Sequence, residues 1–274
     1  MTVVAVGAPH PRDARLAFDA EGHAYWWDGV RVSCSVTGLW ETYFPEFDSD
    51  STIQTYFASW KANPKSKYSA LCQYLELIHG ADEMAQKRAI ASLWEANRAN
   101  AAALGTSLHA AIEDHLITGR LPADGTTPEF RQYVKWRAEV AAAWQPLRVE
   151  WRVYDDKAGI AGTIDSLWLD DDGRLVLVDW KRCKKGALEQ KAYRGETGWG
   201  PCSAIPNTPV GHYTCQQSLY ASILARNYQL VVDRAVLVQL HPDLKTYNAV
   251  PVPLLHDVAT AMLDERQHEC HDGL

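Results

Sequence analysis

The chain has 274 residues, a formal net charge of −7 at pH 7 and a hydrophobic fraction of 47%, which indicates a globular protein of one large domain, or one domain with a substantial extension. The negative charge counts against a protein that coats nucleic acid over its whole surface, but not against an enzyme that grips it locally. No apolar run approaches the ~20 residues of a membrane span. The N-terminus lacks the basic start and long apolar centre of a signal peptide. We therefore expect a soluble, intracellular protein of the cytoplasmic type.

The cysteines are scattered and form no C-x₂-C pair. This pattern indicates reduced thiols rather than a disulfide framework or a zinc site. The six residues are Cys34, Cys72, Cys183, Cys202, Cys215 and Cys270.

The N-terminal region is expected to combine a small β-meander with helices. Alternating apolar residues between Asp/Gly turns predict short strands within residues 15–32. Either Ser33 or Ser35 could cap a short helix over residues 35–45. The pattern is then helical from 50 to 118, and its Ala-rich, Pro-free part from residue 82 predicts one long helix, or two abutting helices with Gly105 at the break.

In the rest of the chain, the order of the predicted helices and strands indicates an α/β core that follows this largely helical N-terminal region. We expect residues 1–99 to form the N-terminal region and residues 100–274 to form the core. The stretch over 186–211 is too long for an ordinary connection, and predicts a functional loop or lid. The other expected elements are a helix at 126–143, strands at 148–155, 159–169 and 174–181, a helix at 212–227, strands at 230–240 and 248–254, and a closing helix at 255–268.

A hairpin over residues 159–181 carries the main chemical signal. A loop of Asp171-Asp172-Gly173, with the glycine in the left-handed conformation, sets a register in which Asp165 pairs with Asp179. Carboxylates opposite each other, with Cβ atoms ~4.5–5.5 Å apart, repel each other unless one is protonated or a cation binds between them. Hard oxygen ligands suit Mg²⁺ or Mn²⁺.

Strand alternation assigns the hairpin residues to faces. It places Asp165 on the same face as Thr163 and Leu167, and Lys181 on the same face as Asp179. An ammonium at Lys181 can hold an attacking water or the negative charge of a transition-state phosphate. The alternative is a surface hairpin with ordinary solvated charges, and the apolar run before Asp179 argues against it.

A helical segment over residues 105–116 adds a histidine to these carboxylates. Gly105, His109 and Glu113 lie one turn apart on one stripe of the helix. A lone histidine on a helix is more often structural than a metal ligand. Here Gly105 permits close backbone approach, and the Glu113 carboxylate could orient the ring from behind.

Taken in order, these residues resemble the RecB-type, lambda-exonuclease-like branch of the PD-(D/E)XK nuclease superfamily, to which mitochondrial genome-maintenance exonuclease is similar. The motifs follow the family's order over roughly residues 100–240. They are Gly105…His109…Glu113, Asp165 in GIAGTIDSL, Asp179 and Lys181 in LVLVDWK, and Gln216-x-x-x-Tyr220 in YTCQQSLYASIL. The resemblance implies an α/β, restriction-endonuclease-like core, in which helices flank a central mixed sheet.

The resemblance also implies a metal-dependent deoxyribonuclease, with exonuclease activity favoured. One or two Mg²⁺ or Mn²⁺ ions would be bound by His109, Asp165, Asp179 and the Trp180 backbone carbonyl. Lys181 would orient or activate the attacking water, while Gln216 and Tyr220 support the site or contact DNA. Glu113 and Glu150 would lie behind the metal ligands.

Local positive charge is needed to bind DNA phosphates. The densest basic cluster begins next to Lys181, and either phosphate contact or an ordinary solvated face accounts for it. The residues that we expect to contact nucleic acid are Arg182, Lys184, Lys185 and Arg194.

The chain departs from some relatives in two respects. Only Cys270 lies near the C-terminus, so we expect no iron–sulfur cluster of the kind that some relatives hold there. There is no helicase motif and no GxxxxGK[ST] loop, so ATP-driven unwinding would need a partner. Linear DNA is the expected substrate, and a helicase, a recombinase or a single-strand-binding protein is a candidate partner in DNA repair or recombination.

Three other functions compete with an exonuclease. The same fold could act as a catalytically inactive DNA-binding module, or as a structure-specific endonuclease. A zinc hydrolase is disfavoured, since the chain has no HExxH motif.

Overall fold

The computed structural model describes residues 6, 9–19, 22, 24–123 and 125–272. The chain divides into two compact units, Met1–Pro45 with Ser107–Leu274, and Glu46–Thr106. Helix α4 (Glu83–Thr118) contributes residues to both. The expected boundary near residue 100 stays a prediction, although strand β4 (Cys34–Ser35), which precedes it, pairs with a strand of the expected core.

The first unit begins with a small antiparallel sheet, which confirms the expected β-meander. Strand β2 pairs with both of its neighbours, for example Trp27 with Leu16 and with Val30. The first of the predicted Asp/Gly turns, over residues 19–22, lies partly outside the described residues. The elements are a 3₁₀ turn η1 (Asp13–Arg15) and strands β1 (Leu16–Asp19), β2 (Ala24–Trp27) and β3 (Val30–Arg31).

Helix α1 (Val36–Glu41) follows this sheet, and its cap is Ser35. The Ser35 hydroxyl accepts a hydrogen bond from the backbone N–H of Gly38 at 2.9 Å, which satisfies one of the free donors at the helix start. The helix is shorter than the predicted 35–45, because the N–H groups of residues 42–44 bond to carbonyls three residues back and form tight turns.

The second unit is helical, as the sequence predicts. It contains α2 (Ser49–Ala62), α3 (Ser69–His79) and the first part of α4. Helix α4 is continuous through Gly105, so the first of the two predicted alternatives is the correct one. Within the described residues, no helix combines the length and apolar character that crossing a bilayer requires. The buried core residues of this unit are Ile53, Phe57, Cys72, Leu75 and Ile90.

A mixed sheet in the order β4-β6-β7-β8-β9 organises the rest of the first unit, with β5 paired along the other edge of β6. The β4–β6 and β7–β8 pairs are parallel, and the others are antiparallel. The fold class predicted from the sequence is therefore confirmed. The remaining strands are β5 (Gln145–Asp155), β6 (Ile160–Leu169), β7 (Leu175–Lys181), β8 (Val232–Gln239) and β9 (Asn248–Val252).

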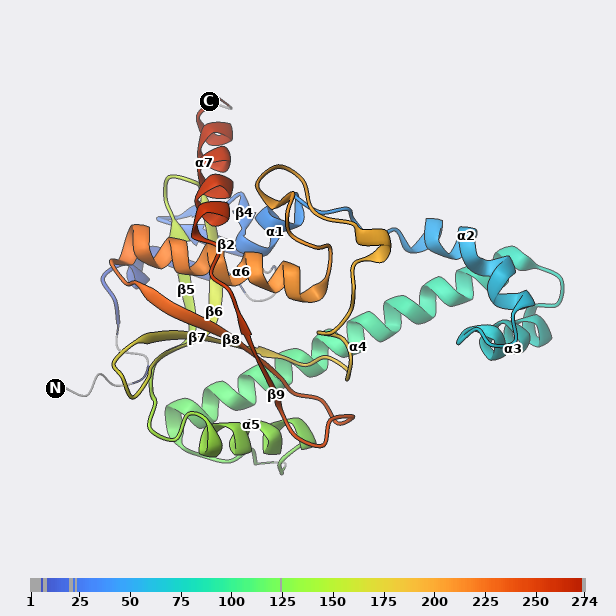
Figure 1. Ribbon diagram of the computed structural model, residues 1–274, viewed down its shortest axis with the longest axis horizontal. Helices are drawn as coiled ribbons and strands as arrows, with labels where there is room; N and C mark the ends of the chain where they lie inside the picture. The colour runs from blue at the N-terminus through green and yellow to red at the C-terminus, as the bar shows by residue number, and fades with distance from the viewer. Residues whose placement is uncertain (1–5, 7–8, 20–21, 23, 124, 273–274) are drawn as a thin grey trace. The chain divides into compact units, whose positions relative to one another are not determined.

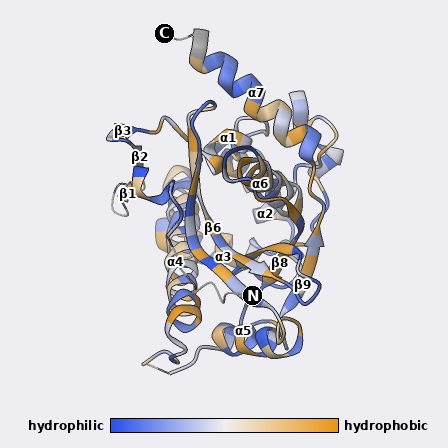
Figure 2. Ribbon diagram, turned by 90° about the vertical axis from the view of Figure 1, so that its left-hand side faces the viewer, coloured by the Kyte–Doolittle hydropathy of each residue, from blue (hydrophilic) through white to orange (hydrophobic). Residues whose placement is uncertain are grey.

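Helices cover both faces of this sheet (Figure 1). Helices α1, α6 (Pro209–Ile223) and α7 (His256–Asp272) share one apolar core with the sheet, while α5 (Pro128–Glu139) and the end of α4 share the other. Strand β7 serves both, since Leu177 lies in the first core and Val178 in the second. Figure 2 shows orange, apolar stretches in the strands between α6 and α5. Burial on both faces explains why the sequence of β7 is an almost uninterrupted apolar run.

The segment between β7 and α6 contains only two short 3₁₀ turns, η2 (Tyr193–Gly195) and η3 (Gly200–Cys202). Helix α6 begins three residues before the predicted start, with Thr208 as its cap and Pro209 in its first turn, where a missing N–H costs nothing. A single π-helical turn, η4 (Leu224–Tyr228), follows α6.

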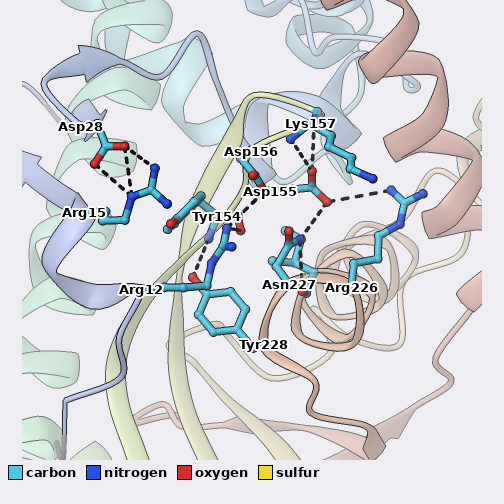
Figure 3. A network of polar contacts seen from close by, with 12 residues as sticks. Arg12, Arg15, Asp28, Tyr154, Asp155, Asp156, Lys157, Arg226, Asn227 and Tyr228 are labelled. Carbon is cyan, nitrogen blue, oxygen red and sulfur yellow. Dashed lines mark hydrogen bonds and ion pairs between the residues drawn. The ribbon is translucent and has the colours of Figure 1, made fainter.

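A buried carboxylate ties the β5–β6 turn to the end of α6 (Figure 3). Asp155 Oδ1 accepts hydrogen bonds from the backbone N–H groups of Lys157 and Ala158, at 3.0 and 2.9 Å. Its Oδ2 accepts one from the Asn227 amide at 3.0 Å, and Arg226 lies 3.9 Å from the same oxygen. The strand pair that carries the candidate site is thereby anchored at its turn.

Candidate metal centre

The candidate site lies where β6 and β7 separate. Their ladder runs from Leu169↔Leu175 to Ser166↔Val178, and Gly173 in the connecting loop has a φ of 78°. The predicted loop and register are therefore confirmed over the paired residues. The next residues along this register are Asp165 and Asp179, at the end of the ladder. Asp165 Oδ2 accepts a hydrogen bond from the backbone N–H of Trp180 at 2.8 Å, so this carboxylate lies between the two strands.

The alternation of β6 is interrupted at Asp165. Ile164 and Leu167 both belong to the core beneath α6, whereas the Thr163 hydroxyl lies 2.8 Å from that of Tyr25. The expectation that Thr163, Asp165 and Leu167 share one face is therefore wrong.

The neighbouring strand β5 shows the cause. Glu150 falls between the paired residues Val149↔Ser166 and Trp151↔Ile164, and it has a left-handed φ of 44°. Such a backbone costs ~1–3 kcal/mol in a residue other than glycine, and it persists only where the surroundings enforce it. Glu150 and Asp165 thus occupy matching positions of one irregularity in the β5–β6 pair.

Three elements bring a nitrogen and two carboxylates together at this irregularity. His109 Nδ1, on α4, lies 3.3 Å from Glu150 Oε1 and 3.7 Å from Asp165 Oδ2. One donor atom from each residue falls within 4.8 Å of the other two. His109 Nε2 also lies 2.9 Å from the Trp180 carbonyl oxygen. Imidazole and carboxylate donors at this spacing fit a divalent cation such as Mg²⁺ or Mn²⁺.

Charge balance within this group is strongly perturbed. Burial would lower the pKa of His109, but the charges of Asp165 and Glu150 outweigh it and raise that pKa to about 9. Burial raises the pKa of Asp165, and the neighbouring His109 and Lys181 oppose this rise. The metal-free site therefore holds a proton on His109 between two carboxylates. A divalent cation would replace that proton as the partner of the two anions.

A second acidic group lies beside the first, at the end of β7. Asp179 Oδ2 lies 2.8 Å from Lys181 Nζ, and the Asp179 side chain is only 3% exposed. Burial raises the pKa of Asp179 to about 6, although the Lys181 ammonium opposes the rise. Burial would lower the pKa of Lys181, but the charges of Asp179 and Asp165 raise it instead. Lys181 is thus a half-buried cation next to two carboxylates.

Helix α6 supplies the polar groups that face this pair. Lys181 Nζ donates to Gln216 Oε1 at 3.4 Å, while Gln217 Nε2 donates to Asp179 Oδ1 at 2.9 Å. The Tyr220 ring is buried and packs against Gly162 of β6. Sequence reasoning found Gln216 and Tyr220 but missed Gln217. The sequence offered no signal for Gln217, because consecutive residues on a helix point in different directions and only Gln216 lies one turn from Tyr220.

A scan against protein-family models matches the PD-(D/E)XK nuclease superfamily over residues 73–269, a range that contains every side chain of this site. The chain belongs to the PD-(D/E)XK nuclease superfamily. No curated protein matches the sequence significantly. Among solved structures, one described as "Crystal structure of SSO0001" is similar at 15% identity, with a TM-score of 0.31. The match covers 74% of this chain and 69% of that chain.

Two of the residues predicted from the sequence, Glu113 and Arg182, do not make the contacts that we expected. Within the described part of the chain, Glu113 makes no hydrogen bond or ion pair with His109, and Glu150 occupies that place instead. Arg182 was expected to contact phosphates, but its Nε donates to Glu129 Oε1 at 2.8 Å and both side chains are largely buried. Among the expected nucleic-acid contacts, Lys184, Lys185 and Arg194 are exposed.

Proposed function

We propose that this protein is a metal-dependent deoxyribonuclease that hydrolyses phosphodiester bonds and acts as an exonuclease on linear DNA. The proposal is carried by one observation, the convergence of His109, Glu150 and Asp165 beside the Asp179–Lys181 pair. Membership of the nuclease superfamily supports it, because the matched region contains this convergence. The exonuclease assignment rests on the ordered motifs of the RecB-type, lambda-exonuclease-like branch.

The cation would be held by His109, Asp165 and Asp179, with the Trp180 carbonyl as a further oxygen donor. Glu150 lies close enough to His109 and Asp165 to serve as another ligand. When bound, Mg²⁺ or Mn²⁺ would supply a Lewis acid for the scissile phosphate and lower the pKa of a bound water. The metal requirement should therefore follow these side chains.

We assign to Lys181 the role of orienting the attacking water and stabilising the negative charge of the phosphate. Its ammonium is held between Asp179 and Gln216, so it is positioned before substrate arrives. The Tyr213 ring, centred 4.5 Å from Nζ, further restricts it. Gln216 and Tyr220 would support this arrangement from α6.

DNA would be held by the basic residues that follow β7. Lys184, Lys185 and Arg194 are exposed, and no ion pair involves them within the described residues. The two lysines follow Lys181 closely in sequence, and the Arg194 guanidinium lies over the Tyr193 ring, so these exposed cations are suited to phosphate contact despite the net charge of −7 for the whole chain. We propose that residues 100–274 carry the nuclease core.

The test is cleavage of linear duplex, single-stranded and closed circular DNA with Mg²⁺, Mn²⁺, Zn²⁺ or EDTA, using Asp179→Ala and Lys181→Ala as matched variants. We expect loss of linear DNA with Mg²⁺ or Mn²⁺, no cutting of circles, and no activity in either variant. Removing groups that act together in such a site lowers the rate by ~10³-fold or more.

The other outcomes select the competing functions. Cutting of circles would keep the site but assign an endonuclease. If no DNA is cut with any metal while the wild type and both variants bind DNA equally, the catalytic proposal fails and the chain is a DNA-binding module.

A further inference from the structure

Helix α6 presents two consecutive glutamines to the site, and they contact different partners. Gln216 Oε1 accepts from the Lys181 ammonium, whereas Gln217 Nε2 donates to Asp179 Oδ1 at 2.9 Å. The resemblance that identified Gln216 through its spacing to Tyr220 assigns no role to Gln217. The Gln217 and Asp179 side chains are almost fully buried, so water does not share this hydrogen bond.

We propose that Gln217 is a positioning residue for Asp179. The Gln217 amide occupies Oδ1 of the Asp179 carboxylate and leaves Oδ2 as the oxygen available to a divalent cation. This inference rests on the proposed metal-dependent function. Oδ2 is the oxygen that lies 2.8 Å from Lys181 Nζ, so the two oxygens of this carboxylate have separate partners. An amide donor fixes the rotation of the carboxylate about its last bond.

The contact spans 38 residues of sequence and joins α6 to the end of β7. Asp179 has no other neutral donor to its side chain within the described residues, since its remaining partner is Lys181. Without the Gln217 amide, a buried carboxylate oxygen would lack a donor, and the group would rotate to find another. That rotation weakens binding of a cation.

Binding of Mn²⁺ to the metal-free protein, followed by the EPR signal of free Mn²⁺, tests this without any cleavage. Gln217→Met keeps the side-chain volume and removes the donor. Gln132→Met is the matched control, because it removes another buried glutamine amide, which donates to the His241 carbonyl at 2.9 Å, and it leaves Asp179 and Lys181 untouched. Gln217→Asn keeps the amide on a shorter side chain, and it decides the question if Gln217→Met does not fold.

We expect Gln217→Met to weaken Mn²⁺ binding by ~10–100-fold, the range found for groups that orient metal ligands from behind, with a smaller loss in Gln217→Asn. Gln132→Met should bind Mn²⁺ like the wild type. Equal Mn²⁺ affinity in wild type and both Gln217 variants would overturn the proposal, as would an equal loss in the Gln132→Met and Gln217→Met variants. A wild type that binds no Mn²⁺ would instead overturn the proposed metal-dependent function itself.

Discussion

The ion pair between Arg182 and Glu129 yields a test that separates stability from DNA binding. It joins the residue after Lys181 to the first turn of α5, and the two side chains are 13% and 8% exposed. Removing one partner of a largely buried pair leaves the other charge without compensation, which costs about 3–5 kcal/mol. We take the lower end, about 3 kcal/mol, because part of the guanidinium still reaches water.

The perturbations are Arg182→Ala, Glu129→Ala and the double replacement of both residues by Met. At ~2–4 °C per kcal/mol for a chain of this size, each single variant should unfold about 6–12 °C below the wild type. The double Met variant should lie near the wild type, because a buried pair can be replaced by apolar side chains at little cost. Urea unfolding followed by Trp fluorescence gives the free energies, and DNA affinity is measured beside them.

If Arg182→Ala unfolds within 1 kcal/mol of the wild type and binds DNA much more weakly, Arg182 is a phosphate contact and the ion pair is incidental. If the double Met variant is as unstable as the single variants, the cost comes from lost packing and not from an uncompensated charge.

Three further predictions concern Gly162, the lysines after β7, and His109. An added Cβ at Gly162 would lie 2.8 Å from the Tyr220 ring, so Gly162→Ala should destabilise the protein by ~1–3 kcal/mol in urea unfolding, and wild-type stability would contradict that packing. Lys184→Ala and Lys185→Ala should each weaken DNA binding and reduce the slope of log K against log salt by ~0.9, whereas an unchanged slope would mean no phosphate contact. In the folded protein the neighbouring carboxylates raise the pKa of His109 from 6.5 to about 9. The stability that its protonation adds is therefore complete below pH 6.5 and is lost as pH rises through about 9. His109→Gln should remove this slope from metal-free unfolding curves, and a slope that survives belongs to another group.

Local chemistry in the sequence determined most of the fold. The β6–β7 loop follows from Gly173, which tolerates a positive φ, and the register follows from the loop length. Apolar residues on both faces of β7 marked a buried strand. Ser33 and Ser35 marked the approximate start of α1, and the structure selects Ser35 as the cap. These features depend on residues within a few positions of one another, so they can be predicted from the sequence alone. The boundaries were less certain, as the early start of α6 at Pro209 shows.

Only the tertiary structure decided which side chains meet at the site. The His109–Glu150, Gln217–Asp179 and Arg182–Glu129 contacts join residues 41, 38 and 53 positions apart, on separate elements. No local period encodes such distances. The left-handed backbone of Glu150 and the interrupted alternation at Asp165 are likewise imposed by the surrounding packing, against the local preference of both residues. The sequence therefore determined the acidic residues and their order, while the packing of α4, α5 and α6 against the sheet decided their partners.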